Sequence, residues 1–396
     1  MRISTNMIYD RNVATIQSTW ANILHAGQEV STSRRVLTPA EDPIAAARAL
    51  DVTQSRGINS QFQTNQDYAN DSLNVLENKL LGVVDKLQYI RTGAMSAGNP
   101  AMTQTELDFI ATDMRSQFDS LLALANTQDA SGDFLFSGYR ADIQPFQGQF
   151  GAVRYEGDQG SRTMQVSATR FMPVSLPGSD VFDNTRTMEG ALNAYGASGN
   201  SAGAALTVTF NPAQPAATDT GRRYEVTCNG GAYSVIEYVP GNPTPSAVAA
   251  TLSGTTLSFN GLDLDVSGFT ATGDKFEVFA ASKNLFKNLE IFIDTLEHPG
   301  ASGVISAVRF GIDTADCALD TTLRVEARVG SQLVELEQLN TLSSDMDLQY
   351  ASTLSRLQDC DYAEAMSRLT QLQVNLEAAQ LSFMKVSGLT LFNYMN

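Results

Sequence analysis

Apolar and small residues recur at alternating spacings of four and three near the start of the chain. Over residues 4–33 the series is Tyr9, Val13, Ile16, Trp20, Ile23, Gly27 and Val30. This alternation keeps one stripe of a helix facing a partner, as in a coiled coil. Gly27 weakens the helix by roughly 1 kcal/mol relative to alanine. The pattern predicts an N-terminal helix with an apolar seam that needs a partner.

A proline-bearing break ends this helix, and a long second helix follows. Thr38 and Glu41 have capping-box spacing, and Asp42 before Pro43 offers a second N-cap. The four-three series then continues to about residue 95. Its members are Ile58, Phe62, Asn65, Ala69, Leu73, Leu76, Leu80, Val83, Leu87 and Ile90. Asn65 within this series resembles a polar residue that fixes the register of paired helices.

A third helix is expected to fold back against the second. Gly98-Asn99-Pro100 ends the long helix, and Thr103 with Glu106 forms another capping-box pair. The series then continues with Leu107, Ala111, Met114, Phe118, Leu121 and Ala125. Residues 43–131 are therefore predicted to form an antiparallel helical hairpin.

The helical period disappears over residues 132–280. Short alternating runs at 205–210, 224–227 and 275–279 are bounded by glycine, proline and asparagine. This pattern is typical of antiparallel β structure. Two β-rich domains are expected, 132–195 and an inserted 196–280, with the stretch 196–203 as the linker between them.

Helical periodicity returns after residue 280 and stops at His298-Pro299-Gly300. A helix over about 302–346 and a last helix over 350–388 are expected. Residues 281–348 are therefore predicted to rejoin the helical bundle. The last helix has Tyr362, Ala365, Leu369, Leu372, Leu376, Ala379, Phe383 and Val386 at four-three spacing. The N-terminal segment 1–42 and the C-terminal segment 349–396 can therefore pair with each other or with copies of themselves. The fold class predicted is α+β, a long antiparallel coiled-coil bundle formed by both termini with central antiparallel β domains.

Composition argues against several functions. The net charge is −17 without a basic stripe, which disfavours nucleic acid binding. No run approaches 18 apolar residues, so no membrane span is expected. Cys228, Cys317 and Cys360 lie at unrelated spacings, which offer no zinc or redox motif. Cys360 is expected to be a small buried residue of the last helix.

The sequence contains no recognised catalytic or ligand-binding signature. The only histidines are His25, expected on a helix surface or seam, and His298, expected in a helix-stop turn. Glycine patterns that cradle phosphates and the nucleophile-elbow pattern do not occur. Asp263 with Asp265 fits turns and caps, and the series Asp313, Asp316 and Asp320 fits a solvated helix face. No catalytic, cofactor-binding or metal-binding residue is predicted.

Three stretches resemble the flagellin and hook-associated protein family. They are residues 2–7 with 34–47 (RRVLTPAEDPIAAA), residues 132–138 (GDFLFSG) with Pro145-Phe146, and residues 359–395. The ending at 385–392 (KVSGLTLF) is more similar to members at the hook–filament junction than to filament flagellin. In the middle, residues 261–268 with 273–276 resemble a β module of hook-associated proteins.

The resemblance implies an extracellular structural subunit of the bacterial flagellum that is exported without a cleaved signal peptide. Implied partners are other copies in a helical ring and a neighbouring hook-associated protein on the hook side. Flagellin or a capping assembly would lie on the filament side. An export chaperone at the C-terminal helix is implied as well, and no cofactor.

We expect assembly through the apolar seams of the terminal helices. A helix with one seam has little to pack on in a monomer, so 1–42 is expected to be disordered or partly ordered there. Neighbouring copies would cover the seams, and each large aliphatic side chain contributes about 1.5–3 kcal/mol. The predicted assembly residues are Tyr9, Val13, Ile16, Trp20, Ile23, Val30, Leu369, Leu372, Leu376, Phe383, Val386 and Leu391. Filament flagellin, and a secreted enzyme with a catalytic central β domain, remain as alternatives.

Overall fold

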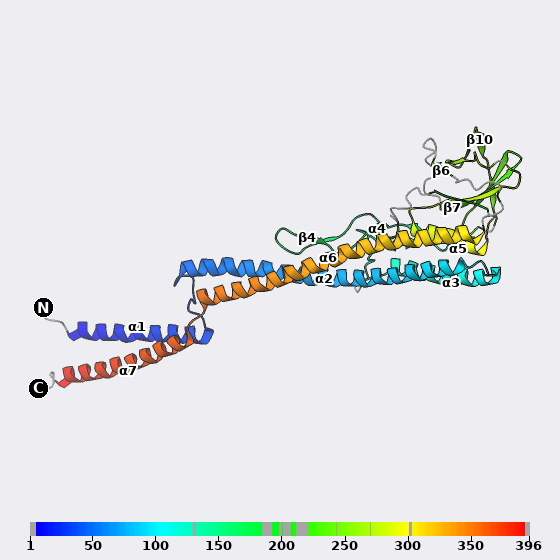
Figure 1. The fold of residues 1–396 in the computed structure, drawn as a ribbon. Coiled ribbons are helices and arrows are strands. Elements are labelled where there is room, and N and C mark those ends of the chain that lie inside the picture. The colour runs from blue at the N-terminus through cyan, green and yellow to red at the C-terminus, as the bar shows by residue number, and fades with distance from the viewer. Residues whose placement is uncertain are drawn as a thin grey trace. The chain divides into compact units, whose positions relative to one another are not determined.

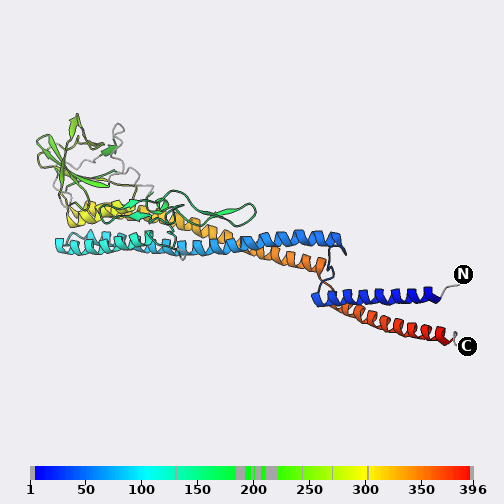
Figure 2. The same ribbon diagram turned by 180° about the vertical axis from the view of Figure 1, so that it is seen from behind.

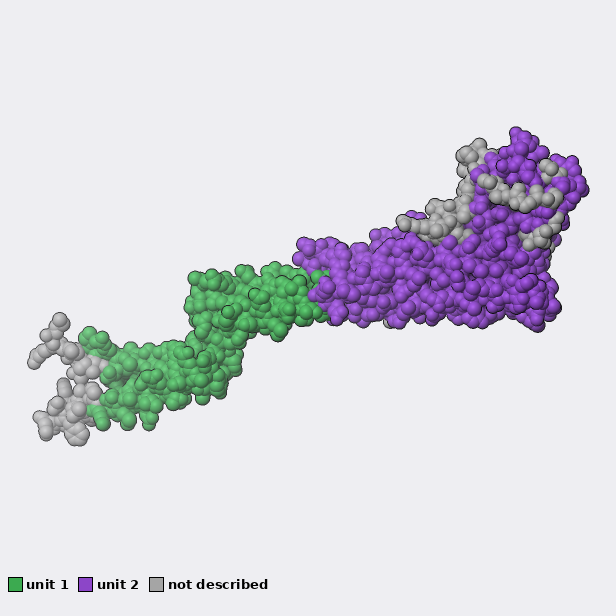
Figure 3. All heavy atoms as spheres, viewed as in Figure 1, with its two compact units in different colours: residues 1–64, 339–396 green, residues 65–338 purple. Residues whose placement is uncertain are grey.

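The fold is described from a computed structural model of the 396-residue chain. The structure describes residues 5–129, 132–183, 192–197, 200, 207–210, 221–242, 244–269, 271–300 and 303–392. Two compact units divide the chain (Figure 3). The first unit contains residues 1–64 and 339–396, and the second contains residues 65–338. Helices and antiparallel strands both occur, so the predicted α+β class is confirmed.

The first unit is entirely helical in its regular structure. It contains α1 (Thr5–Thr32), α7 (Tyr362–Phe392), the beginning of α2 (Pro43–Ala97) and the end of α6 (Val304–Gln358). Helices α1 and α7 lie side by side (Figures 1 and 2). Of the two pairings that the sequence left open for the terminal helices, with each other or with copies, pairing with each other is present within the chain.

The helical boundary expected between residues 346 and 350 is also wrong. One helix, α6, runs through to Gln358, because the polar stretch there contains neither glycine nor proline. The break falls at residues 359–361, where Asp361 Oδ1 accepts hydrogen bonds from the backbone N–H groups of Ala363 and Glu364. An aspartate N-cap of this kind starts α7. Cys360 lies in this linker, half-buried, and not in a helix.

The two linkers of the first unit hydrogen-bond to one another. Arg34 and Asp359 form an isolated antiparallel bridge. The Arg35 N–H donates to the Gln358 carbonyl at 2.7 Å, and the Cys360 N–H donates to the Ser33 carbonyl at 3.1 Å. Both connections to the terminal helix pair are thereby tied together.

The proline-bearing break contains a turn followed by a helix cap. Glu41 accepts hydrogen bonds from the Leu37 N–H and the Thr38 hydroxyl, both at 2.9 Å. Asp42 Oδ1 accepts from the Ala45 N–H at 3.0 Å, with Pro43 as the first residue of α2. Of the two candidate caps in the sequence, Asp42 therefore caps α2, and the Thr38–Glu41 pair closes the preceding turn.

The second unit is built on the antiparallel hairpin of α2 and α3 (Gln104–Ala125), and the predicted seam of α3 is confirmed. All six predicted seam residues of α3 are buried, and the capping box at Thr103 and Glu106 is present. Lys86 of α2 hydrogen-bonds to Gln117 of α3, and Tyr89 hydrogen-bonds to Asp113. The residue number rises along α2 as it falls along α3, so the two helices are antiparallel. Asn65, predicted to fix helix register, instead donates to the Gln165 carbonyl at 2.7 Å.

Residues 132–183 form a mostly irregular segment with a few short strands, here called the cover, which packs on α5 (Leu285–Glu297). Its strands are β1 (Phe146–Gln147), β2 (Arg154–Tyr155), β3 (Thr163–Gln165) and β4 (Phe171–Pro173), followed by the short α4 (Ser179–Phe182). Strand β1 pairs with β2, and β3 pairs with β4. Aromatic rings anchor the cover on α5, with Phe146 and Phe182 at 5.1 and 5.6 Å from Phe286.

The remaining strands form two packed sheets, here called the sandwich. One sheet contains β5 (Leu192–Gly196), β13 (Lys275–Ala280), β7 (Arg222–Asn229), β8 (Ala232–Tyr238) and β9 (Ser246–Val248), in that order. The other contains β10 (Thr251–Ser253), β11 (Thr256–Phe259), β12 (Leu262–Asp265) and β6 (Thr207–Phe210). The predicted runs at 205–210, 224–227 and 275–279 coincide with strands, although residues 205–206 lie outside the described residues.

The predicted boundary at residues 195–196 falls inside β5. This strand pairs along β13, with Leu192 opposite Ala280, so the sandwich begins and ends on neighbouring strands. Of the linker expected at 196–203, Gly196 is the last residue of β5, whereas residues 198–199 and 201–203 lie outside the described part. The composition of residues 196–203 resembles that of a linker because glycine, alanine and serine are common both in linkers and after the end of a strand.

Strand β13 packs on both of its faces. Phe276, Val278 and Ala280 belong to the core between the two sheets. The alternating residues face the helices: Phe279 stacks on Phe310 of α6 at 5.0 Å, and Glu277 Oε2 accepts a hydrogen bond from the Ser306 hydroxyl. Because side chains of a strand alternate between faces, β13 joins the sandwich to α6.

A buried ion pair lies under the turn after α5. Arg223 Nη1 and Glu277 Oε1 are 3.0 Å apart, and both side chains are almost fully buried. Arg223 Nη2 also donates to the His298 carbonyl at 3.1 Å. His298 is the C-cap of α5, which confirms its prediction as a helix-stop residue. Gly300 completes this turn, and a Cβ there would overlap the Glu277 carboxylate.

We predict that Gly300→Ala destabilises the second unit by about 1–3 kcal/mol, because the added methyl group must displace a buried charged group. Urea denaturation should measure this loss. Gly330→Ala in α6 is the matched control, since no atom lies within 4 Å of its added Cβ. It should stabilise the helix by up to about 1 kcal/mol. Equal changes in the free energy of unfolding for the two substitutions would contradict the close packing of Gly300 against Glu277.

We predict that the turn at residues 37–41 loosens only in strong acid. The Leu37 N–H, then the Thr38 and His25 side chains, lower the pKa of Glu41 from 4.5 to about 2. Since the folded pKa is lowered, ionised Glu41 stabilises the turn above about pH 4.5, and this effect is lost as the pH falls through 2. The Leu37 amide resonance should titrate near pH 2 and be flat in Glu41→Gln. A midpoint near 4.5 would be inconsistent with these hydrogen bonds.

Candidate assembly surface

The N-terminal half of the predicted assembly residues is only partly covered by α7. Val13, Ile16, Ile23 and Val30 are half-buried, and Ala26, which the seam prediction omitted, is buried. Tyr9 and Trp20 are 53% and 49% exposed. The covered face of α1 is therefore rotated from the predicted seam, so that the two aromatic residues lie at its edge.

The C-terminal half follows the predicted series more closely. Leu376 is buried, and Leu369, Leu372 and Phe383 are half-buried. The rings of Phe383 and Tyr9 are 5.1 Å apart, a direct contact between the two terminal helices. The side chains of Val386 and Leu391 lie outside the described residues.

A second apolar face on the terminal helices was not predicted. On α7, Val374 and Leu381 are 59% and 51% exposed. Each lies two positions from a residue of the covered face, which places it on the opposite side of the helix. The exposed large apolar residues of the two helices are Met7, Leu24, Met366, Val374, Leu381 and Met384, together with Tyr9, Trp20 and Tyr362 from the predicted series. We call this set the outer apolar face.

The sequence held a signal for this face in the spacing of seven between Val374 and Leu381. The stronger four-three series on the same helix contains most of its large apolar residues and obscures this spacing. A helix with apolar residues on two sides is expected to be buried on both. Among the described residues of the first unit, large apolar side chains of α7 are covered on the side that faces α1 and exposed on the other.

The adjoining segments of α2 and α6 add further exposed apolar residues. Ile44 and Leu50 in α2 and Leu348 in α6 are each 69% exposed. Polar contacts hold these segments together: Arg56 forms a bidentate ion pair with Asp347, and Asn59 donates to the Ser343 carbonyl at 2.7 Å. The specific contacts in this part of the unit are thus polar, and several large apolar side chains stay outside.

His25 is a structural contact between α1 and the following turn. Its Nδ1 lies 3.0 Å from Glu29 and its Nε2 lies 3.2 Å from Glu41. Both ring nitrogens therefore face carboxylates of the same unit. This arrangement places His25 at a partly exposed position of α1, in keeping with the prediction of a helix surface or seam residue.

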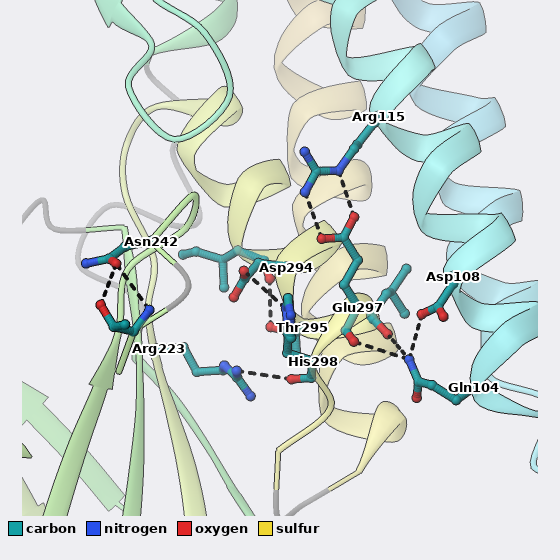
Figure 4. Close-up of polar contacts among 12 residues, drawn as sticks. Gln104, Asp108, Arg115, Arg223, Asn242, Asp294, Thr295, Glu297 and His298 are labelled. Carbon is teal, nitrogen blue, oxygen red and sulfur yellow. Dashed lines mark hydrogen bonds and ion pairs between the residues drawn. The ribbon is translucent and has the colours of Figure 1, made fainter. Parts of the chain in front are cut away.

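The titratable groups around the end of α5 line a cavity of about 240 Å³ (Figure 4). Arg115 forms a bidentate pair with Glu297, with both distances 2.7 Å. Burial raises the pKa of Asp294, whose Oδ1 lies 3.6 Å from His298 Nδ1. These charged groups are engaged with one another, which fits a structural contact between α3, α5 and the sandwich.

The described residues give little support for other kinds of site. Within the described residues, no group of three or more histidine, cysteine, aspartate or glutamate side chains is arranged to hold a metal ion. None of the helices in the described part is both long and apolar enough to cross a membrane. Asp313, Asp316 and Asp320 are exposed on α6, as predicted for a solvated face.

Comparison with known protein families supports the resemblance seen in the sequence. Residues 3–141 match the family model of the bacterial flagellin N-terminal helical region. The flagellar hook-associated protein 3 of Salmonella typhimurium is 33% identical over 184 residues, and so is that of Escherichia coli. The matched segment is 46% of this chain and spans 57% of the length of each relative.

Solved structures share the fold over most of the chain. The flagellar hook-associated protein-3 from Legionella pneumophila is 25% identical, with a TM-score of 0.55. The match covers 77% of this chain and 98% of that one. FlgL of Xanthomonas campestris, at 23% identity, also has a TM-score of 0.55 and covers 77% of this chain and 99% of its own. This chain is thus similar to the flagellin N-terminal helical region, to curated proteins named flagellar hook-associated protein 3, and in fold to solved structures named hook-associated protein-3 or FlgL.

Proposed function

We propose that this chain is a structural, non-enzymatic subunit of the bacterial flagellum that joins hook to filament by assembling with copies of itself. The observation that carries this proposal is the outer apolar face of α1 and α7. These helices already cover each other on one side, so the uncovered side is available for neighbouring copies. This revises the predicted mechanism, in which the seams themselves were covered only by neighbours.

The size of the outer apolar face suits assembly of many subunits. Nine large side chains lie about half exposed, so their full burial contributes about 1 kcal/mol each. The total is comparable with the cost of association, about 4–15 kcal/mol. A single contact is therefore marginal, whereas a subunit between two neighbours is held firmly. Cooperative ring formation is the expected behaviour.

A ring needs a contact that is not returned by the same pair of copies. The exposed residues of α1 and α7 differ in type and spacing, and we propose that α1 of one copy meets α7 of the next, whose own α1 meets α7 of a third copy. A contact between two different surfaces is heterologous, and repeated heterologous contacts generate rings or helical arrays. The helical ring predicted from the sequence follows from such a contact.

The wider assembly is proposed from the family. One solved neighbour, at 23% identity, is described as the flagellar junction protein FlgL from Legionella pneumophila. By analogy, this chain would contact a hook-associated protein on the hook side and flagellin or a capping assembly on the filament side. It would act outside the cell after export without a cleaved signal peptide. An export chaperone would cover the exposed side of α7 before assembly.

The two alternatives have less support. Filament flagellin is not favoured, because the curated relatives and the solved structures bear the name hook-associated protein 3 or FlgL. A catalytic sandwich has no supporting observation, since the charged groups at its contact with α5 pair with one another. The sandwich is proposed as an outward spacer, as expected from its sequence.

We predict that Val374→Ser combined with Leu381→Ser blocks incorporation into flagella, because both changes fall on the outer apolar face. Immunogold labelling of complemented flagella should show no band at the distal edge of the hook, and filaments should be absent. Circular dichroism of the monomer should remain unchanged, since neither residue is buried.

The matched control is Phe171→Ser combined with Val334→Ser, two residues of similar exposure in the second unit. This control should incorporate normally as a narrow band at the hook's distal edge. Normal junctions from the α7 variant would refute the role of the outer apolar face. Labelling along the whole filament would instead indicate a flagellin.

A further inference from the structure

Methionine supplies three of the nine residues of the outer apolar face. Met7 of α1 is 60% exposed, and Met366 and Met384 of α7 are 38% and 59% exposed. In the second unit, by contrast, Met114 of α3 and Met172 of β4 are buried core residues. The thioether groups of the terminal helices are therefore open to small reagents from solvent, whereas these two core thioethers are not.

The two methionines of α7 lie on one side of that helix. They are 18 positions apart, which equals five turns of an α-helix. Phe383, the residue before Met384, contacts Tyr9 of α1 with ring centroids 5.1 Å apart. Because successive residues of a helix differ by about 100° in direction, Met384 is directed away from this contact. Both methionines thus lie on a side of α7 that the helix pair leaves exposed.

Methionine suits a contact between copies only while its sulfur is reduced. The reduced side chain is flexible and apolar and adapts to neighbouring surfaces. Hydrogen peroxide converts it to the sulfoxide: a sulfur lone pair forms a bond to one peroxide oxygen, the O–O bond breaks, and the other oxygen leaves as hydroxide. The proton on the transferred oxygen then joins the hydroxide to form water. Sulfur is oxidised, the peroxide is reduced, and the side chain becomes polar.

We propose that Met7, Met366 and Met384 are an oxidative modification site through which hydrogen peroxide blocks assembly. This role rests on the proposed function, because it takes the outer apolar face as the contact between copies. In the monomer the sulfoxide groups remain hydrated, so the fold is kept. In the contact each sulfoxide oxygen loses water without gaining a hydrogen-bond donor, which opposes assembly.

Assembly and oxidation compete for the same sulfur atoms. A methionine that a neighbouring copy covers has lost its access to peroxide, so subunits already in place are protected. A subunit that is oxidised beforehand cannot join. The site therefore excludes damaged subunits and leaves the assembled structure intact.

Peptide mass spectrometry of the full chain tests the selectivity of the reaction. After brief treatment of the monomer with hydrogen peroxide, Met7, Met366 and Met384 should gain one oxygen atom on the order of 10- to 100-fold faster than Met114 and Met172, because susceptibility follows exposure. In purified flagella the first three should react more slowly than in the monomer. Equal rates in the monomer and in flagella would overturn the site.

Competition for isolated hooks, taken from cells that lack this chain, tests the effect on assembly. Labelled full chain competes with unlabelled, untreated chain, and the bound fraction is measured. Peroxide treatment should weaken binding on the order of tenfold for each sulfoxide on the face. The variant with Met7→Leu, Met366→Leu and Met384→Leu keeps the apolar side chains and should bind equally before and after treatment.

A single substitution imitates the oxidised state without peroxide. Met384→Gln places a polar amide on the outer apolar face and should weaken binding to hooks about tenfold. Met95→Gln is the matched control, because Met95 of α2 is 46% exposed but lies outside this face. It should bind as the wild type. Circular dichroism of both variants should match that of the wild type, since neither side chain is buried.

Three results would overturn the modification site: undiminished binding of the peroxide-treated wild type, an equal loss in the leucine variant, or equal binding of Met384→Gln and Met95→Gln. If Val374→Ser with Leu381→Ser blocks incorporation while peroxide does not, the modification site fails and the proposed function stands. If the untreated wild type does not bind hooks, the proposed function fails and the modification site with it.

Discussion

Two paired helices can cover only one side of each other, and this limit governs the first unit. Leu376 and Phe383 face α1, whereas Val374 and Leu381 on the same helix face away from it. A chain that ended as a self-contained monomer would carry polar residues on the second side. The apolar residues found there are exposed within the first unit, which supports the proposed contact with neighbouring copies.

The second unit depends on a different constraint, the alternation of side chains along β13. Phe276 and Val278 enter the sandwich core, while Glu277 and Phe279 contact α6 and the turn after α5. One strand thus belongs to two interfaces. A buried charge at such a position must be paired, and Arg223 from the adjacent β7 provides the partner. The sandwich is therefore held on the helices by specific polar contacts as well as by apolar packing.

Periodicity predicted the helical elements well because seam residues and caps act locally. The buried face of α3 matched all six expected positions, and its capping box formed at Thr103 and Glu106. Predictions were wrong where one local sequence pattern is compatible with two structures. The polar stretch near Ser343 resembled a helix end but is tolerated inside α6, and the true end is marked by the Asp361 cap.

The amino-acid sequence by itself determined the class of fold, the two terminal helices and the absence of local catalytic motifs. These follow from spacing along one element and from residue type. Only the tertiary structure decided that α1 and α7 cover each other, that their outer sides remain apolar, and that β5 joins the sandwich. Each of these depends on which segment, distant in sequence, packs against the element, as Phe383 of α7 packs against Tyr9 of α1. Periodicity identifies the stripe that must be buried, but the partner that buries it is selected by packing across the whole chain.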